Sequence, residues 1–139
     1  PIILFSLFYI FIATREYIGL HWVWGVFAVV AFFPYAAATA WFMGAIGLDG
    51  TTASYTPIAF LIAAYGIYLL RDLPDVGRGL IIGASLLGLS LTFRALDIPL
   101  CDQWPIGTHF VWHLLNGVML GWMIEVYRRH RLSIAAEQS

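Results

Sequence analysis

Five apolar runs, separated by short polar stretches, set the architecture expected for this chain. The runs cover residues 1–14, 20–46, 55–70, 80–96 and 106–127, and the first of them is the shortest. A helix needs about 20 apolar residues to cross the roughly 30 Å hydrocarbon core of a bilayer, a length that these runs approach. Inside hydrocarbon every backbone polar group must be satisfied internally, so helices are the expected form. The pattern therefore predicts an all-α, polytopic membrane helix bundle with five transmembrane helices, the second of them kinked at Pro34.

The polar stretches between the runs are short and are expected to form loops. They cover residues 15–16, 48–51, 71–75 and 97–105, and residues 132–139 form a polar C-terminal tail that is expected to be frayed. We find no internal repeat, linker or low-complexity tract in the sequence. Residues 1–139 are therefore predicted to form a single membrane-embedded domain.

The composition agrees with a membrane protein and excludes several other classes. Of the 139 residues, 61% are hydrophobic and only 11% are charged, whereas soluble domains have about 25% charged residues. That leaves too little polar surface to keep a soluble protein dispersed. The net charge of −1 gives no electrostatic reason to expect a nucleic-acid partner, and a single cysteine, Cys101, excludes a disulfide within the chain.

The arginines predict how the helices are oriented, because basic residues are retained on the cytoplasmic side of a membrane. One side of the predicted bundle holds Arg15, Arg71, Arg78, Arg128, Arg129 and Arg131. The other side holds at most Arg94. We therefore expect the C-terminus to be cytoplasmic. Asp97, Cys101 and the start of the fifth helix then face the extracytoplasmic side.

His109 and His113 are the residues that most strongly suggest chemistry. They are four positions apart, so they lie on one face of a helix, one turn apart, where two imidazoles can bind one zinc ion. Asn116 lies three positions further on and could orient a ligand through a hydrogen bond. The alternative is a pair of interfacial histidines that bond to backbone or water. Ionisable groups at membrane depth usually mark functional sites, which favours the metal.

Two histidines do not complete a zinc site, because catalytic zinc generally has three protein ligands and an open position. The other histidines, His21 and His130, fall on the predicted cytoplasmic side. We interpret His21 as an interfacial anchor and His130 as a solvated tail residue. A third ligand is therefore expected from elsewhere, for which a preceding N-terminal segment is the natural source.

Arg94 and Asp97 are three positions apart at the outer end of the fourth run. They could form a local ion pair that closes the helix. Alternatively, Asp97 borders the metal and orients its water or a ligand imidazole. Ser85 and Ser90 lie on the same run, and hydroxyls in membrane helices more often bond back to their own backbone than act as nucleophiles.

Two adjoining stretches of the sequence resemble the C-terminal signature of the alkaline ceramidases and their bacterial relatives. They are Leu91-Thr92-Phe93-Arg94-x-Leu96-Asp97 and Asp97-x-x-x-Cys101 with Trp104-Pro105-x-Gly107-Thr108-His109-x-x-Trp112-His113. The motif spans about 25 residues and is more specific than the histidine pair alone. More loosely, the five runs resemble helices three to seven of a seven-helix membrane hydrolase superfamily that includes the progestin and adipoQ receptors.

The resemblance implies roles for four residues of this chain. His109 and His113 match zinc ligands of the last helix, and Asp97 matches an acidic residue of the preceding loop, which we take as a candidate catalytic residue. Cys101 matches a cysteine that can pair with one near the N-terminus. The family's Ser-x-x-x-His, which supplies the third zinc ligand, has no match here, and neither does its next catalytic aspartate. The chain is therefore expected to be truncated just downstream of that aspartate.

The function that these features predict is a zinc-dependent membrane amidase acting on a ceramide-like N-acyl lipid. It would release a fatty acid and an amine, and it would be competent only with the missing N-terminal helices, so that this piece alone is expected to be inactive. Calcium is a further possible cofactor, with its site in the missing segment. The first rival is a non-enzymatic receptor or lipid-binding protein on the same scaffold. The second is a membrane haem protein, which is less favoured because axial ligands usually come from two helices.

Overall fold

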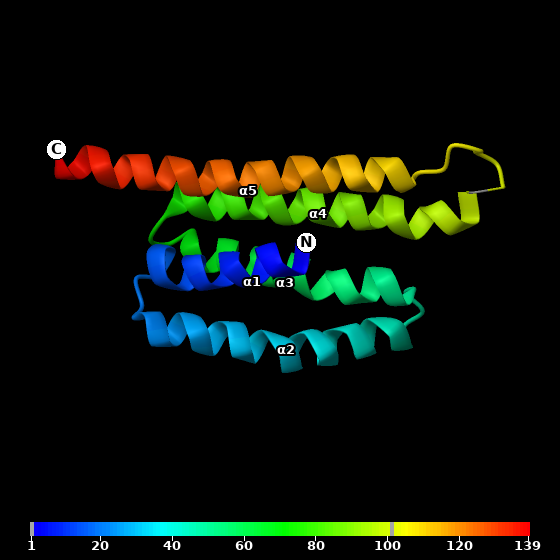
Figure 1. The fold of residues 1–139 in the computed structure, drawn as a ribbon, viewed down its shortest axis with the longest axis horizontal. Helices are drawn as coiled ribbons and strands as arrows, with labels where there is room; N and C mark the ends of the chain where they lie inside the picture. Colours follow the sequence, from blue (N-terminus) through cyan, green and yellow to red (C-terminus); the bar gives the residue numbers. More distant parts are fainter. Residues whose placement is uncertain (1, 101) are drawn as a thin grey trace. The chain divides into compact units, whose positions relative to one another are not determined.

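The computed structural model describes residues 2–100 and 102–139, apart from the side chain at position 98. This part of the chain folds into helices: α1 (Ile2–Ile12), the π-helical segment η1 (Ala13–Tyr17), α2 (Trp22–Ala45), α3 (Gly50–Leu69), α4 (Pro74–Leu100) and α5 (His109–Gln138) (Figure 1). The predicted all-α class is confirmed.

Three helices in the described residues are long and apolar enough to cross a membrane. They are α2, α3 and the stretch Pro74–Asp97 of α4. These spans agree with the predicted membrane class. Helix α1 has only 11 residues, and α5 carries a charged C-terminal part, so the predicted crossings of these two helices stay predictions.

Contacts divide the chain into two compact units, one ending at Ile58 and the other spanning Ala59–Ser139. The single domain over residues 1–139 stays a prediction. The first unit is built on the contact between α1 and α2. Gly25 permits this contact, because a Cβ atom there would lie 2.7 Å from Cδ2 of Phe11. Arg15 and Glu16, which we expected in a loop, lie in η1.

Helix α3 begins at Gly50, five residues before the predicted start at Tyr55, because Asp49 caps it. The Asp49 Oδ2 atom accepts hydrogen bonds from the backbone N–H groups of Thr51 and Thr52, at 3.1 and 3.0 Å. These N–H groups have no partner within the helix itself, so a capping carboxylate stabilises its first turn. The hydroxyl of Tyr35 on α2 donates to the carbonyl of Pro57 on α3 at 3.0 Å, and links these two helices.

The second unit is dominated by an antiparallel pair, α4 and α5, that lie side by side (Figure 1). Buried positions on both helices alternate in steps of four and three residues. On α4 they include Val76, Leu80, Gly83, Leu87 and Ser90, and on α5 they are Trp112, Asn116, Met119, Met123, Val126 and His130. This spacing is typical of helices that pack nearly parallel or antiparallel along a seam.

Two glycines of α4 let the helices approach closely. A Cβ atom at Gly79 would lie 2.6 Å from Cγ2 of Val126, and one at Gly83 would lie 2.6 Å from the Met123 sulfur. The indole N–H of Trp122 donates to the Gly79 carbonyl at 2.8 Å. Small residues at such contacts are how membrane helices pack without a hydrophobic driving force.

Both helices of this pair are longer than the apolar runs predicted. Helix α4 begins at Pro74 rather than Leu80, because proline suits the first turn of a helix, where its missing N–H is not needed. It also continues through Asp97 to Leu100, so Asp97 lies in a helix and not in the predicted loop. Helix α5 continues to Gln138, and most of the tail that we expected to be frayed is helical.

Candidate functional site

The connection from α4 to α5 turns at Gly107, and glycine is needed there for two reasons. Its φ of +68° lies in the left-handed region that residues with a Cβ atom avoid. In addition, a Cβ atom would lie 2.8 Å from Oδ1 of Asp97. The turn therefore brings the start of α5 directly against the Asp97 carboxylate.

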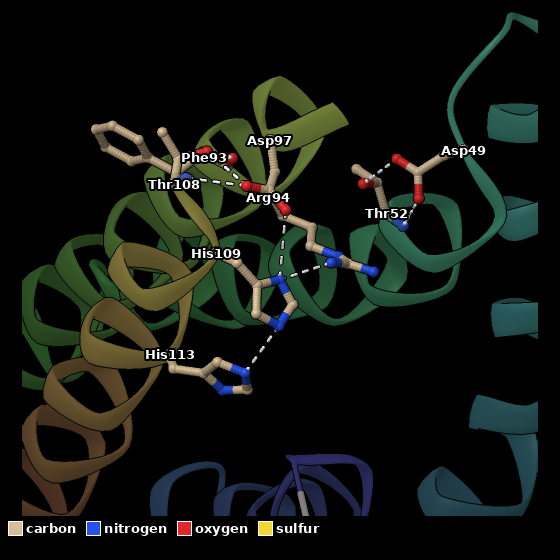
Figure 2. A network of polar contacts seen from close by, with 8 residues as sticks. All are labelled: Asp49, Thr52, Phe93, Arg94, Asp97, Thr108, His109 and His113. Atoms are coloured by element: carbon tan, nitrogen blue, oxygen red, sulfur yellow. Dashed lines mark hydrogen bonds and ion pairs between the residues drawn. The ribbon is translucent and has the colours of Figure 1, made fainter. Parts of the chain in front are cut away.

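Asp97 anchors the first residues of α5. Its Oδ1 atom accepts a hydrogen bond from the backbone N–H of Thr108 at 2.9 Å, and the Thr108 hydroxyl donates to the Phe93 carbonyl at 2.9 Å (Figure 2). A negative charge is favourable at a helix N-terminus because the helix dipole is positive there. Asp97 thus has a structural role, which the sequence motif did not reveal, in addition to its place beside the histidines.

His109 and His113 point toward each other, as their four-residue spacing predicts. Their Nε2 atoms are 3.1 Å apart and their ring centroids are 4.7 Å apart (Figure 2). Two imidazole nitrogens that bind one tetrahedral zinc ion at 2.0–2.1 Å are separated by about 3.3 Å. The pair therefore fits two corners of a zinc site. An N–H···N hydrogen bond between the rings has the same spacing, so both interpretations stay open.

The Nδ1 atom of His109 contacts two groups on α4. The Nη1 atom of Arg94 is 2.8 Å away, and Oδ2 of Asp97 is 3.7 Å away. A guanidinium can only donate, so the Arg94 contact requires a lone pair on Nδ1. A histidine that binds metal through Nε2 instead carries its proton on Nδ1 and usually donates it to a carboxylate or carbonyl. Arg94 and Asp97 therefore favour opposite proton positions on this ring.

Arg94 is a partly buried cation among aromatic rings. Its Cζ atom lies 5.3 Å from the centroid of the Trp112 ring, and its Nε atom is buried without a hydrogen-bond partner in the described residues. The spacing of Arg94 and Asp97 allows an ion pair, but the ion pairs of the described residues do not include it. Arg94 contacts His109 instead. Sequence reasoning did not assign Arg94 to the site. The signal that could have found it is that it is the one arginine assigned to the predicted extracytoplasmic side.

The two serines of α4 behave differently. Ser85 donates to the Ile81 carbonyl at 2.8 Å, which confirms the predicted bond to its own helix. For Ser90 that prediction is wrong, because its hydroxyl crosses the seam to Oδ1 of Asn116 at 2.9 Å and to the Trp112 carbonyl at 3.1 Å. Ser90 is fully buried. Asn116 thus bonds to α4, and no hydrogen bond between it and a histidine is described.

The other histidines lie away from this pair along the chain. His21 caps α2, since its Nδ1 accepts from the Val23 N–H at 3.5 Å. The prediction that His130 is a solvated tail residue is wrong, because it is only 8% exposed. Helix α5 continues past it and places it on the buried seam. Within residues 2–100 and 102–139 no group of three or more His, Cys, Asp or Glu side chains could hold a metal ion. Cys101 lies outside the described residues.

No family model matches the chain, and no curated protein or solved structure matches it either. The ceramidase-like assignment therefore stays a prediction, carried by the motif itself.

Proposed function

We propose that this chain is the part comprising helices three to seven of a zinc-dependent membrane amidase, which hydrolyses an N-acyl lipid to a fatty acid and an amine. The observation that carries the proposal is the convergence of the His109 and His113 Nε2 atoms, 3.1 Å apart, beside Asp97. The ceramidase-like motif, which contains all three residues, supplies the reaction class. The third zinc ligand comes from N-terminal helices that precede this chain.

In this proposal His109 and His113 hold the metal through Nε2. Zinc, when bound, polarises a substrate carbonyl and lowers the pKa of its water to about 7. The two oxygens of Asp97 have different partners. Oδ1 accepts a hydrogen bond from the backbone N–H of Thr108, while Oδ2 accepts one from the Nδ1–H of His109. Asp97 is thereby a positioning residue for the imidazole. The 3.7 Å separation means that a small side-chain movement completes this hydrogen bond.

Arg94 binds the negative charge that the reaction generates. Amide hydrolysis adds water across the C–N bond, and the acyl half leaves as a carboxylate while the amine takes the proton. A guanidinium pairs well with a carboxylate through two N–H groups. Arg94 has a buried Nε–H without a partner in the described residues, so it is suited to receive the carboxylate once it turns away from His109.

The experiment uses the protein encoded by the full reading frame that contains this chain, purified in detergent. We expect one zinc per protein by elemental analysis and release of fatty acid from an N-acyl sphingosine. His113→Ala should lower bound zinc and activity together, by at least about a hundredfold in activity, because a ligand to the catalytic metal is lost. His21→Ala is the matched control and should keep both.

Stoichiometric zinc with no fatty acid release from any N-acyl sphingoid or N-acyl amino-acid lipid would contradict the amidase function. Lipid binding without turnover, unaffected by His113→Ala, would instead indicate the non-enzymatic receptor or lipid-binding protein.

A further inference from the structure

A second polar site lies at the other end of the α4–α5 pair, between the first turns of α4 and the last turns of α5. It is a cavity of about 350 Å³. Its apolar lining includes Val76, Ile82 and Val126, and its polar lining includes Arg78, Arg129 and His130. More than ten residues of each helix separate it from His109 and Asp97, so it does not belong to the histidine site.

The wall of this cavity is fixed by Trp122. Its indole N–H donates to the Gly79 carbonyl at 2.8 Å, and its ring lies 5.8 Å from the Cζ atom of Arg129. His130 is buried, and the Ser133 hydroxyl donates to its carbonyl at 2.8 Å. The cavity therefore combines an ordered apolar and aromatic wall with cationic groups.

Carboxylates near the cavity only partly offset its two guanidinium groups. Arg129 donates through Nε to Glu125 at 2.8 Å, but Glu125 also binds Arg128 at 2.7 Å, so two cations share one anion. That contact uses one of the five N–H donors of Arg129. Arg78 lies 3.9 Å from Asp75, and the two side chains are 71% and 98% exposed, so water screens this pair. Asp75 is the one acidic residue among the described residues that line the cavity.

The combination fits the head group of a membrane lipid better than a soluble anion. Guanidinium groups bind phosphate oxygens through paired N–H donors. The apolar lining continues into a helix that is long and apolar enough to cross a membrane, so it can contact the glycerol and the first carbons of acyl chains. Basic pockets between membrane helices on the cytoplasmic side are known to bind anionic lipid head groups. This is also the end of the helices that the arginine distribution places in the cytoplasm.

We propose that this cavity binds the phosphate of an anionic phospholipid, with Arg78 and Arg129 on the phosphate and Val126 and Ile82 against the apolar part of the lipid. The site is independent of the proposed amidase function, since it shares no residue with the histidine pair.

The test is native mass spectrometry of the complete chain in detergent, titrated with dioleoyl phosphatidylglycerol or dioleoyl phosphatidylcholine. We expect adducts with phosphatidylglycerol at lower lipid concentration. Arg129→Gln and Arg78→Gln should each weaken that binding about tenfold, the size expected for a lost charge-assisted hydrogen bond. Arg131→Gln is the matched control: it removes the same charge from a nearby exposed position of α5 that does not line the cavity, and it should change binding less than about twofold.

Three results would overturn the proposal. Equal weakening by all three variants would indicate nonspecific attraction by surface charge. Equal binding of the two lipids would show that the net negative charge is not recognised. Competition by glycerol 1-phosphate as strong as that by phosphatidylglycerol would identify a soluble phosphate, not a lipid, as the ligand. Circular dichroism of each variant verifies that these exposed substitutions leave the helices folded.

Discussion

The Nδ1 atom of His109 contacts both Arg94 and Asp97. The cation favours an unprotonated Nδ1, and the carboxylate favours a protonated one. Arg94, at 2.8 Å, requires Nδ1 to accept, whereas Asp97, at 3.7 Å, can only accept from it. Metal binding through Nε2 favours the second arrangement, because the ring proton must then be on Nδ1. Arg94 therefore opposes metal binding in two ways, through this hydrogen bond and through its positive charge.

Arg94→Met should consequently raise the zinc affinity of the chain. We expect an increase of about tenfold, within the range over which residues that contact metal ligands alter metal affinity. Competition with a chromophoric chelator measures it in detergent. Arg128→Met, which removes the same charge at the far end of α5, should leave the affinity unchanged. An unchanged or lower affinity for Arg94→Met would show that Arg94 does not compete for His109.

The spacing of residues along one helix predicted some of these contacts, and the packing of α5 against α4 determined the others. The four-residue spacing of His109 and His113 predicted their shared face, and the hydroxyl of Ser85 bonds to its own helix as expected. The contacts of Ser90 with Asn116, and of Arg94 with His109, join residues 26 and 15 positions apart. Such pairs depend on how α4 and α5 are aligned, which no short motif encodes.

The seam between α4 and α5 depends on small residues at fixed positions. Gly79 and Gly83 leave room for Val126 and Met123, and these contacts keep the backbones close. The Trp122 bond to the Gly79 carbonyl and the Ser90 bond to Asn116 both cross the same seam. A larger residue at Gly79 must separate the helices or displace Val126, whose branched side chain has few alternative conformations.

Gly79→Ala should therefore destabilise the protein, even though alanine is the better helix former. We expect a loss of about 1–3 kcal/mol in the free energy of unfolding, which is typical of overpacking. Gly88→Ala on the same helix is the control. A Cβ atom there meets nothing within 4 Å, so it should be neutral or stabilise the protein by up to about 1 kcal/mol.

Denaturant titration in detergent, followed by circular dichroism, measures both changes. Adding Val126→Ala to Gly79→Ala should recover part of the loss, since it removes the methyl groups that the new Cβ would meet, and the double-mutant cycle isolates that coupling. Equal stability of Gly79→Ala and Gly88→Ala would contradict the close contact at Gly79.

Hydrophobicity located the helices but not their ends. Each of the five runs overlaps a helix in the described residues. The helix ends differ from the ends of the apolar runs because capping and helix propensity extend a helix into polar sequence. Asp49 caps α3 ahead of its apolar run, and Pro74 suits the first turn of α4. The end of α5 extends for a similar reason, since Ala135, Ala136 and Glu137 are good helix formers.

At the scale of the whole molecule, the predicted five crossings with a cytoplasmic C-terminus imply that the histidine site is extracytoplasmic and that the basic cavity is cytoplasmic. We expect a cysteine introduced as Asp102→Cys, in a Cys101→Ser background, to react with a membrane-impermeant maleimide in intact cells. A cysteine introduced as Ser139→Cys should react only after the cells are permeabilised. Labelling of Ser139→Cys in intact cells, with Asp102→Cys protected, would reverse the orientation. Labelling of both in intact cells would exclude an odd number of crossings between them.

The sequence predicts only part of the proposed zinc site. The motif and the described residues give two converging imidazoles and a neighbouring carboxylate, and they give no third ligand. A metal site whose ligands come from helices far apart in the sequence is not encoded in any one short motif. The same holds for substrate specificity, because the acyl chain and head group of a lipid contact many helix faces.

The bond between Ser90 and Asn116 also has a consequence for how the protein is made. The two residues are 26 positions apart, so at about 5–20 residues per second the ribosome completes Asn116 roughly one to five seconds after Ser90. During that interval α4 exists without α5, and the carbonyl groups of its own backbone are available acceptors for the Ser90 hydroxyl. Synthesis of α5 then offers Ser90 an acceptor on a neighbouring helix. We therefore expect the Ser90–Asn116 bond to form only when α5 packs against α4.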